Sequence, residues 1–293
     1  MATAALSRHE SGALVARTTT DRELLRAFLE HDRLWAAYAI CDLDDREFQR
    51  TRWGVAFDGH EPVAVGLEYA GTTPQPLFLM GRPDGVDAIL RDVVRLRAAY
   101  VAALPELLPS VARHYRLDPG PAMVRMWVDR STFRPASAAA DVRRLLPVDI
   151  GDLNRLYQLG FASWLPSSSI VEGVYYGLRV GGRLVSAAGT HVVSPAARLA
   201  VVGNVLTTAE QRGRGYATAV TGAVTADLLR TSDQVVLNVR ADNPPALQAY
   251  RKLGYQEHVR FEERLAHRTG TPLAGLAEPI RRWLAGRKES EPR

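Results

Sequence analysis

The sequence predicts an α/β (α+β) protein made of two domains, each a mixed and mostly antiparallel sheet with helices on both faces. Two observations predict it. The chain has 293 residues, about twice the length of a typical domain. Each half places a strand hairpin, turning at Gly59 in the first and at Gly181 and Gly182 in the second, before a further strand and a helix. That order of elements is typical of a mixed sheet with packed helices.

In the first half, helical spacing covers residues 21–40, where Leu24, Leu25, Phe28 and Leu29 share one face. The next elements follow from alternating or continuous apolar runs between glycines and prolines. They are a hairpin over 52–70, a strand over 75–80, a helix from Pro83, an amphipathic helix over 94–115 and a strand over 122–129.

The segment 130–141, RSTFRPASAAAD, is small and polar and carries a proline, so the domain junction is placed there. The predicted domains are residues 1–137 and 138–268, and residues 269–293 are expected to form a C-terminal helix and tail. The elements of the second half follow from the same signals. They are a strand over 142–146, a helix over 147–160, a hairpin over 174–193, strands over 199–206, 234–241 and 256–265, and helices over 216–229 and 244–254.

Composition limits the partners and the compartment. An apolar share of 46% with 24% charged residues is that of an ordinary globular protein. No apolar run approaches the roughly 20 residues of a membrane span, and no secretory signal is evident. The net charge of +5 comes from dispersed arginines, so neither nucleic acid nor membrane is an expected partner. The single cysteine, Cys41, excludes an internal disulfide framework and a cysteine-based zinc site, which favours a cytoplasmic protein. A monomer or a homodimer is expected.

The stretch 201–224, VVGNVLTTAEQRGRGYATAVTGAV, passes from a buried strand through Gly213 and Gly215 into a helix. A strand that enters glycines at a helix start leaves a group of backbone N–H donors, which suits a phosphate or pyrophosphate. Arg212 and Arg214 add positive charge there. The alternative is a tight turn without a ligand. The dinucleotide G-x-G-x-x-G pattern and the lysine of a P-loop are both missing.

Two linked motifs decide between these alternatives. RGRGYA at 212–217 fits the pattern Arg/Gln-x-x-Gly-x-Gly/Ala after a strand that ends in Val205, Leu206 and Thr207. ADNPPALQAYRKLGY follows at 241–255, with its asparagine, tyrosines and glycine in register. Over about residues 141–265 the chain resembles the GNAT superfamily of acyl-CoA-dependent N-acyltransferases. Within that superfamily it is most similar to the branch that includes glycine N-acyltransferase-like proteins.

The resemblance implies transfer of an acyl group from acetyl-CoA or another acyl-CoA, without a metal, to the amine of a small molecule or amino acid by direct attack. It also implies the residues that bind acyl-CoA. Strand-edge groups of Val205, Leu206 and Thr207 would pair with the pantetheine arm. The pyrophosphate would lie against Arg212, Gly213, Arg214, Gly215, Tyr216, Ala217 and Thr218. Asn243, expected to cap a helix that begins at Pro244, would lie near the cofactor.

Tyr250 stands where the superfamily places a general acid for the leaving thiolate; the alternative is a core aromatic in a stripe with Leu247 and Leu253. The base is less defined. Many superfamily members keep a glutamate on the strand before the glycine turn, but the polar residue here is Asn204, whose amide can hold water or substrate and cannot accept the proton. Glu172 and His191 lie on or beside the preceding strands, and His191 would titrate in the right range if its side chain is partly exposed. A structural role for His191 is the alternative.

The first half lacks these motifs. Its turn after the strand over 75–80 reads GRPDGVD, where Pro83 removes a donor and Asp84 puts a negative charge where a pyrophosphate would sit. This half is therefore predicted to be a degenerate GNAT-like domain that completes the sheet and walls the acceptor pocket. The aromatic candidates for that wall are Trp35, Tyr38, Trp53 and Trp164. The alternative function for the whole chain is a non-catalytic acyl-CoA-binding sensor or scaffold.

Overall fold

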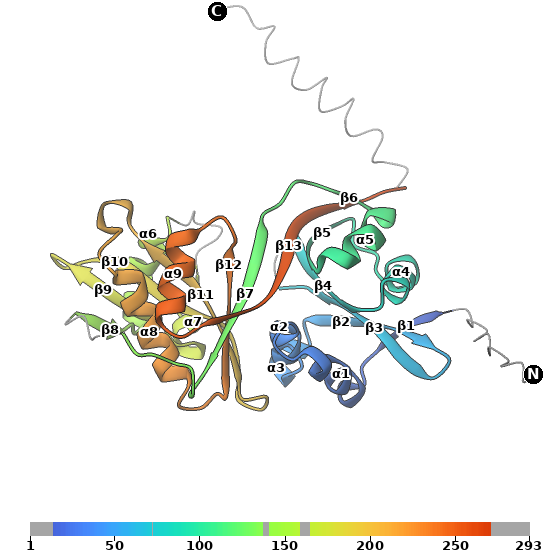
Figure 1. Cartoon of the computed structure of the whole chain (residues 1–293), viewed down its shortest axis with the longest axis horizontal. Coiled ribbons are helices and arrows are strands. Elements are labelled where there is room, and N and C mark those ends of the chain that lie inside the picture. The colour runs from blue at the N-terminus through green and yellow to red at the C-terminus, as the bar shows by residue number, and fades with distance from the viewer. Residues whose placement is uncertain (1–13, 72, 137–140, 159–164, 271–293) are drawn as a thin grey trace, which may run out of the picture. The chain divides into compact units, whose positions relative to one another are not determined.

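The computed structural model of the chain describes residues 14–71, 73–136, 141–158 and 165–270 (Figure 1). Trp164 and the predicted helix of the C-terminal tail lie outside these residues. Internal contacts divide the chain into two compact units. Unit 1 consists of Met1–Thr20, Arg52–Gly120 and Glu263–Arg293, and unit 2 consists of Asp21–Thr51 and Pro121–Glu262.

Unit 2 is built on a mixed sheet in which the described strand pairs are antiparallel except for β11 with β12. The strand order is β13-β7-β12-β11-β10-β9-β8. The strands are β7 (Ala122–Asp129), β8 (Val142–Arg144), β9 (Tyr176–Val180), β10 (Arg183–Ser194), β11 (Leu199–Thr207), β12 (Gln234–Arg240) and the first part of β13 (Gln256–Arg268). This arrangement confirms the predicted mixed and mostly antiparallel sheet.

Helices cover both faces of this sheet. On β10, Val185 belongs to the core beneath α8 (Tyr216–Leu228) and α9 (Pro244–Lys252), whereas Leu184 belongs to the core with α6 (Ile150–Leu156) and α7 (Ser168–Glu172). The two helix pairs therefore pack against separate cores of this sheet. None of the described helices has both the length and the apolarity of a bilayer span.

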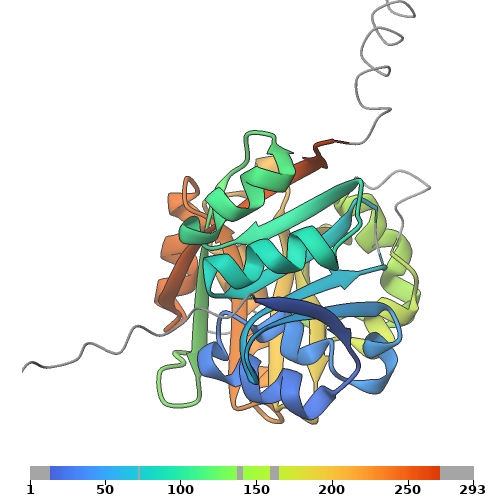
Figure 2. The same cartoon turned by 90° about the vertical axis from the view of Figure 1, so that its right-hand side faces the viewer.

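Unit 1 has its own set of strands and its own core. Its strands are β1 (Val15–Thr19), β2 (Thr51–Asp58), β3 (Glu61–Tyr69), β4 (Gln75–Gly81), β5 (Ala98–Ala103), β6 (Tyr115–Leu117) and the second part of β13. Helices α4 (Pro83–Asp92) and α5 (Leu108–His114) lie across these strands in Figure 2. Their apolar residues share one buried cluster with those of β4 and β5.

Two predicted helices are wrong in part. The helix expected over 94–115 contains β5, which pairs in parallel with β4, and only its end is helical, as α5. Alternate burial of Ala99, Val101 and Ala103 on β5 outweighs the helical preference of an alanine-rich run. The helix expected over 21–40 is broken into α1 (Arg22–Leu29), a 3₁₀ turn at Glu30–Asp32 and α2 (Ala37–Cys41).

Each unit is built from stretches that are not continuous in the sequence. Residues 21–51, with α1, α2 and α3 (Asp45–Phe48), belong to unit 2, where α2 contacts β10 and β11. β7 precedes the predicted junction yet lies between β12 and β13 in the sheet of unit 2. The compact units thus follow a different division from the predicted sequence domains 1–137 and 138–268, which remain a prediction.

Candidate functional site

A cavity of about 930 Å³ opens in unit 2 where β11 and β12 stop pairing. Their parallel ladder joins Leu199–Val202 to Gln234–Leu237 only, and the residues beyond it on both strands line the cavity. Its volume lies within the roughly 300–1,000 Å³ of typical ligand pockets. The end of the ladder therefore places a ligand-sized opening inside the sheet.

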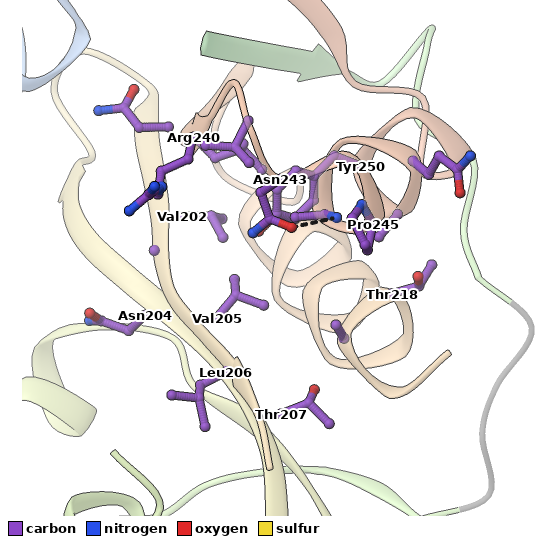
Figure 3. A pocket seen from close by; sticks show the side chains of 18 of the residues that line it. Val202, Asn204, Val205, Leu206, Thr207, Thr218, Arg240, Asn243, Pro245 and Tyr250 are labelled. Carbon is purple, nitrogen blue, oxygen red and sulfur yellow. Dashed lines mark hydrogen bonds between the residues drawn. The ribbon is translucent and has the colours of Figure 1, made fainter. Parts of the chain in front are cut away.

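A β-bulge lies at the mouth of this opening. Gly203 pairs with Gly189 and Leu206 with Ala187, so Asn204 and Val205 together oppose one residue of β10. Asn204 has a φ of 53°, in the left-handed region, and its carbonyl accepts a hydrogen bond of 2.5 Å from the Tyr157 hydroxyl. A bulge bends its strand and increases the local twist. Figure 3 shows Val205, Leu206 and Thr207 following one another along this strand beside the cavity.

The glycine turn enters the same cavity. Gly213 and Gly215 have φ values of 77° and 80°, and Gly215 caps the N-terminus of α8 without a side chain. A Cβ on either glycine would meet nothing within 4 Å, so space is not the reason for glycine at these positions. The reason is the left-handed backbone, which glycine adopts without strain. The first helical bond runs from Ala219 N to Gly215 O, which leaves the N–H groups of residues 216–218 without a helical partner. Tyr216, Ala217 and Thr218 line the cavity.

Positive side chains line the cavity, although the Arg240 guanidinium is also paired with Asp242 at 2.6 Å. Arg212 lines it and donates to the Thr207 carbonyl at 3.3 Å, whereas Arg214 is not among the lining residues. Arg240 and Lys252 also line it, and the sequence motifs did not assign them. Among the described residues, no aspartate or glutamate lines the cavity. The described wall therefore favours an anionic ligand at the N-terminus of α8.

Gln211 is a further lining residue that sequence reasoning missed. Its Oε1 atom is buried and accepts no hydrogen bond from the described residues. A buried acceptor without a hydrogen bond costs folding free energy. We therefore expect a bound molecule or a water to donate to this oxygen. Its position directly before RGRGYA was the available signal.

Asn243 and Tyr250 line the cavity from α9. The predicted cap is confirmed: Asn243 Oδ1 accepts a hydrogen bond of 3.3 Å from Ala246 N, and Pro244 begins the helix (Figure 3). Tyr250 is 6% exposed, packs in the same core as Leu247 and Leu253, and has its pKa raised to about 12 by burial. Among the described residues its hydroxyl has no hydrogen-bond partner. The side chain is thus both a core aromatic and a hydroxyl on the cavity wall.

His191 lines the cavity on β10, with its ring 6.0 Å from that of Tyr38. A Cβ at Gly203 would come within 2.0 Å of His191 Nε2, so the imidazole lies directly on the glycine backbone. His191 is exposed to the open cavity, yet desolvation by the surrounding protein lowers the pKa of its imidazole below the ordinary value. The imidazole is therefore neutral near pH 7, the form that accepts a proton.

The Asn204 side chain is oriented by its neighbours. Its Nδ2 atom donates to the Tyr175 hydroxyl at 3.2 Å, and that hydroxyl donates to the Thr190 carbonyl at 3.1 Å. A carbonyl only accepts, so the single proton of Tyr175 is used there and its oxygen must accept from Asn204. This leaves Asn204 Oδ1, which has no partner among the described residues, as the acceptor on the cavity wall.

The other predicted residues lie elsewhere. Glu172 ends α7 rather than a strand and forms an ion pair of 2.7 Å with Arg46, away from the cavity-lining set. Of the aromatic wall candidates, Tyr38 lines the cavity, whereas Trp35 is fully buried and packs edge-on against Phe261 at 5.1 Å. Trp53 belongs to β2, in unit 1. The acidic residue Glu172 is therefore not part of the described cavity.

In unit 1, the turn between β4 and α4 corresponds to the glycine turn, and the Asp84 side chain takes up a backbone donor there. α4 begins at Pro83, and Asp84 accepts hydrogen bonds from Gly85 N at 2.9 Å and from Arg82 at 2.6 Å. The Arg82 guanidinium holds the pKa of Asp84 below its ordinary value, so the carboxylate is ionised at neutral pH. A negative charge at this helix start opposes binding of a second anion.

Comparisons with known proteins agree with this geometry. The family model of FR47-like proteins matches residues 175–265. No curated protein sequence matches the chain. A solved Drosophila protein shares 13% identity at a TM-score of 0.64, covering 86% of this chain and 98% of its own. A GCN5-related N-acetyltransferase from Sphaerobacter thermophilus shares 17% sequence identity with this chain at a TM-score of 0.59. The match covers 88% of this chain and 97% of the other.

A tandem GNAT protein from the clavulanic acid biosynthesis pathway shares 15% identity at a TM-score of 0.55, with 88% of this chain and 98% of that one covered. At such identities the likeness concerns the fold. The fold of the chain is thus GNAT-like, with the mixed sheet and helices of that fold, and a tandem relative fits its two units. The predicted fold class is confirmed.

Proposed function

We propose that the chain is an N-acyltransferase that takes its acyl group from acyl-CoA, with acetyl-CoA as the donor, and transfers it to the amine of a small molecule or amino acid. One observation carries the proposal. The bulged edge of β11, the open N-terminus of α8 and the side chains of Arg212, Arg240 and Lys252 meet in one cavity. The extended pantetheine arm of acyl-CoA matches the strand edge of β11. Its diphosphate matches the helix N-terminus and the positive side chains.

In this proposal the donor is bound mainly by backbone groups. The pyrophosphate lies at the N–H groups of Tyr216, Ala217 and Thr218, where the helix dipole favours negative charge. The pantetheine arm follows the edge of β11 from Thr207 towards Val205, as an added strand would. Gln211 Oε1 is an acceptor for a donor group of the bound molecule.

The transfer itself needs a neutral amine and a route for its proton. The amine lone pair forms a C–N bond to the thioester carbon while the carbonyl electrons move to oxygen. Collapse re-forms the C=O bond and breaks the C–S bond, and the leaving thiolate takes a proton from the Tyr250 hydroxyl. The ammonium proton passes to His191, and solvent returns it to Tyr250, so the protein ends unchanged.

Asn204 has a positioning role in this proposal. Its Oδ1 atom is turned from Tyr175 and can accept an N–H of the incoming amine. The amide has no basicity at neutral pH, so it orients the nucleophile and His191 accepts the proton. The two roles explain how a chain without a cavity carboxylate among its described residues performs this chemistry.

A second candidate function is a non-catalytic acyl-CoA-binding sensor or scaffold. The observation that favours it is the packing of Tyr250 into the core with Leu247 and Leu253, together with a described cavity wall that has no carboxylate. Both functions predict donor binding, so binding alone cannot separate them.

The deciding experiment measures release of CoA thiol from acetyl-CoA by the full-length protein in the presence of a panel of primary amines. The proposed function predicts amine-dependent release for at least one member, and acylation of that amine seen by mass spectrometry. Calorimetric binding of acetyl-CoA without amine-dependent release for any member would favour the sensor or scaffold instead.

A further inference from the structure

The His191 imidazole is not oriented by a hydrogen bond. Within the part of the chain that the structure describes, neither of its ring nitrogens has a hydrogen-bond partner. A histidine that transfers protons is commonly held in one orientation by such a bond at its second nitrogen. An imidazole without that bond rotates between rotamers unless neighbouring groups pack against it. Packing must therefore hold this ring on the cavity wall.

Two groups pack against the imidazole. On β11, a Cβ at Gly203 would lie 1.9 Å from His191 Cδ2, so the ring rests on the glycine backbone. On α2, the ring of Tyr38 has its centre 6.0 Å from that of His191, with an angle of 48° between the ring planes. Ring centres roughly 4.5–7 Å apart are typical of interacting aromatic pairs. The imidazole thus contacts a backbone without a side chain and an aromatic side chain.

The backbone that carries Tyr38 is fixed on the same sheet. α2 contacts β10 and β11, and the four other residues of α2 are buried. Just beyond α2, Asp44 accepts a hydrogen bond of 2.9 Å from the hydroxyl of Ser194. Ser194 belongs to β10, the strand that carries His191. Tyr38 therefore has a defined position relative to His191.

Arg125 holds the Tyr38 ring from β7. Its guanidinium is 3% exposed and lies 5.3 Å from the centre of that ring. A cation within about 6 Å of the centre of an aromatic face is attracted to it. The guanidinium is itself fixed by hydrogen bonds to the Trp35 carbonyl and, at 2.9 Å, to Asn238 Oδ1. A chain of contacts thus runs from Arg125 through Tyr38 to His191.

We infer that Tyr38 is a positioning residue for acyl transfer, because its ring keeps the His191 imidazole against Gly203, where the imidazole accepts the ammonium proton. The inference rests on the proposed function, which gives His191 that role. Proton transfer depends steeply on geometry, and a misplacement of about 1 Å can cost roughly a hundredfold in rate. Tyr38 acts through His191 and is assigned no proton. The ring of Tyr38 makes the contacts with His191 and Arg125, so a phenylalanine in its place keeps them.

The first test compares Tyr38→Leu, which removes the ring, with Tyr38→Phe, which keeps it. Thiol release from acetyl-CoA with the most active amine of the panel gives kcat and KM. Tyr38→Leu should lower kcat by roughly ten- to a hundredfold with little change in KM for acetyl-CoA, and Tyr38→Phe should retain most of the wild-type kcat. The control is Tyr100→Leu, which makes the same change at an exposed tyrosine of β5 outside the cavity lining and should leave kcat unchanged.

The kinetic pattern distinguishes positioning from a role in the wall of the acceptor pocket. A wall residue contacts the amine, so its loss raises KM for the amine and leaves kcat at saturating amine unchanged. That result in folded Tyr38→Leu, or a wild-type kcat and KM, would overturn the inference. Equal losses of kcat in Tyr38→Leu and Tyr38→Phe would also overturn it, because the hydroxyl rather than the ring would then be responsible.

A spectroscopic measurement on the wild-type protein separates this inference from the proposed function, because it needs no turnover. With histidine and tyrosine rings labelled, NMR should show a nuclear Overhauser effect between ring protons of Tyr38 and His191, whose ring centres are 6.0 Å apart. The signals are assigned by their absence in Tyr38→Phe and His191→Gln. If no amine releases thiol, the transfer proposal fails and this effect decides alone, as it does if Tyr38→Leu does not fold. Its presence supports the placement of His191 by Tyr38, and its absence overturns it.

Discussion

The imidazole of His191 lies so close to Gly203 that a Cβ there would be 1.9 Å from Cδ2 and 2.0 Å from Nε2. Gly203→Ala should therefore force the ring from its place on the cavity wall. If His191 accepts the ammonium proton, turnover should fall by roughly a hundredfold or more, while the affinity for acetyl-CoA changes little.

The matched control for that substitution is Gly151→Ala on α6. A Cβ there would be 3.9 Å from its nearest neighbour, an atom of Arg155, so nothing has to move. Steady-state kinetics should show normal turnover in this variant. Normal turnover in Gly203→Ala as well would show that the position of His191 does not matter to the reaction.

The pH dependence follows from the protonation of His191. Desolvation by the surrounding protein holds the pKa of this exposed imidazole below its ordinary value of about 6.5, and activity needs the neutral form. As the pH falls, kcat should stay constant through about 6.5 and decline only at lower pH. At saturating amine, kcat reports the protonation of groups in the enzyme–substrate complex. His191→Gln should lower kcat and remove this limb, and a limb centred above 6.5 in the wild type would contradict the assignment.

Gly215→Glu should abolish acetyl-CoA binding in isothermal titration. The substitution strains a residue with φ of 80° and brings a carboxylate to the donors that start α8. Gly59→Glu is the control, because Gly59 has φ of 61° and open space in a hairpin of unit 1. Both variants should remain folded by circular dichroism. Unchanged affinity in folded Gly215→Glu would place the pyrophosphate elsewhere.

Tyr250→Phe removes one hydroxyl and keeps the packed ring. Turnover should fall by roughly ten- to a thousandfold with little change in acetyl-CoA affinity. Tyr255→Phe is the comparison: its ring lies 6.0 Å from that of Tyr250, and its hydroxyl bonds Thr225 Oγ1 at 2.8 Å in the core. That variant should lose stability and keep its kcat. Normal turnover in Tyr250→Phe would show that Tyr250 is only a core aromatic. Loss of acetyl-CoA binding would show that Tyr250 supports the structure of the binding site, and either outcome would contradict its role as the general acid.

Local signals explain which parts of the fold were predictable. Asn243 before Pro244 marks a helix start, and Gly213 and Gly215 after an apolar strand mark a left-handed turn, because these residue types act through their own backbone. The predicted positions of α8 and α9 follow from such signals. Tyr250 was predictable as a position in a motif, although its two roles were not separable.

The remaining features depend on pairing between distant segments. The sequence of β5 predicts a helix, and only its pairing with β4 makes it a strand. The bulge at Asn204 is defined by the register between β11 and β10, which local sequence does not give. The contact of Arg125 with Asn238 joins strands on either side of the predicted junction. Such relationships shape the cavity beyond the parallel ladder, and local sequence signals do not show them.

The most direct test of acyl transfer measures free CoA thiol and acylated amine in the same reaction, by thiol titration and by mass spectrometry. The account predicts equal amounts of both products from wild-type protein, and neither from Gly215→Glu. Thiol release without acylated amine would indicate hydrolysis, and tight acetyl-CoA binding with neither product would contradict catalysis altogether.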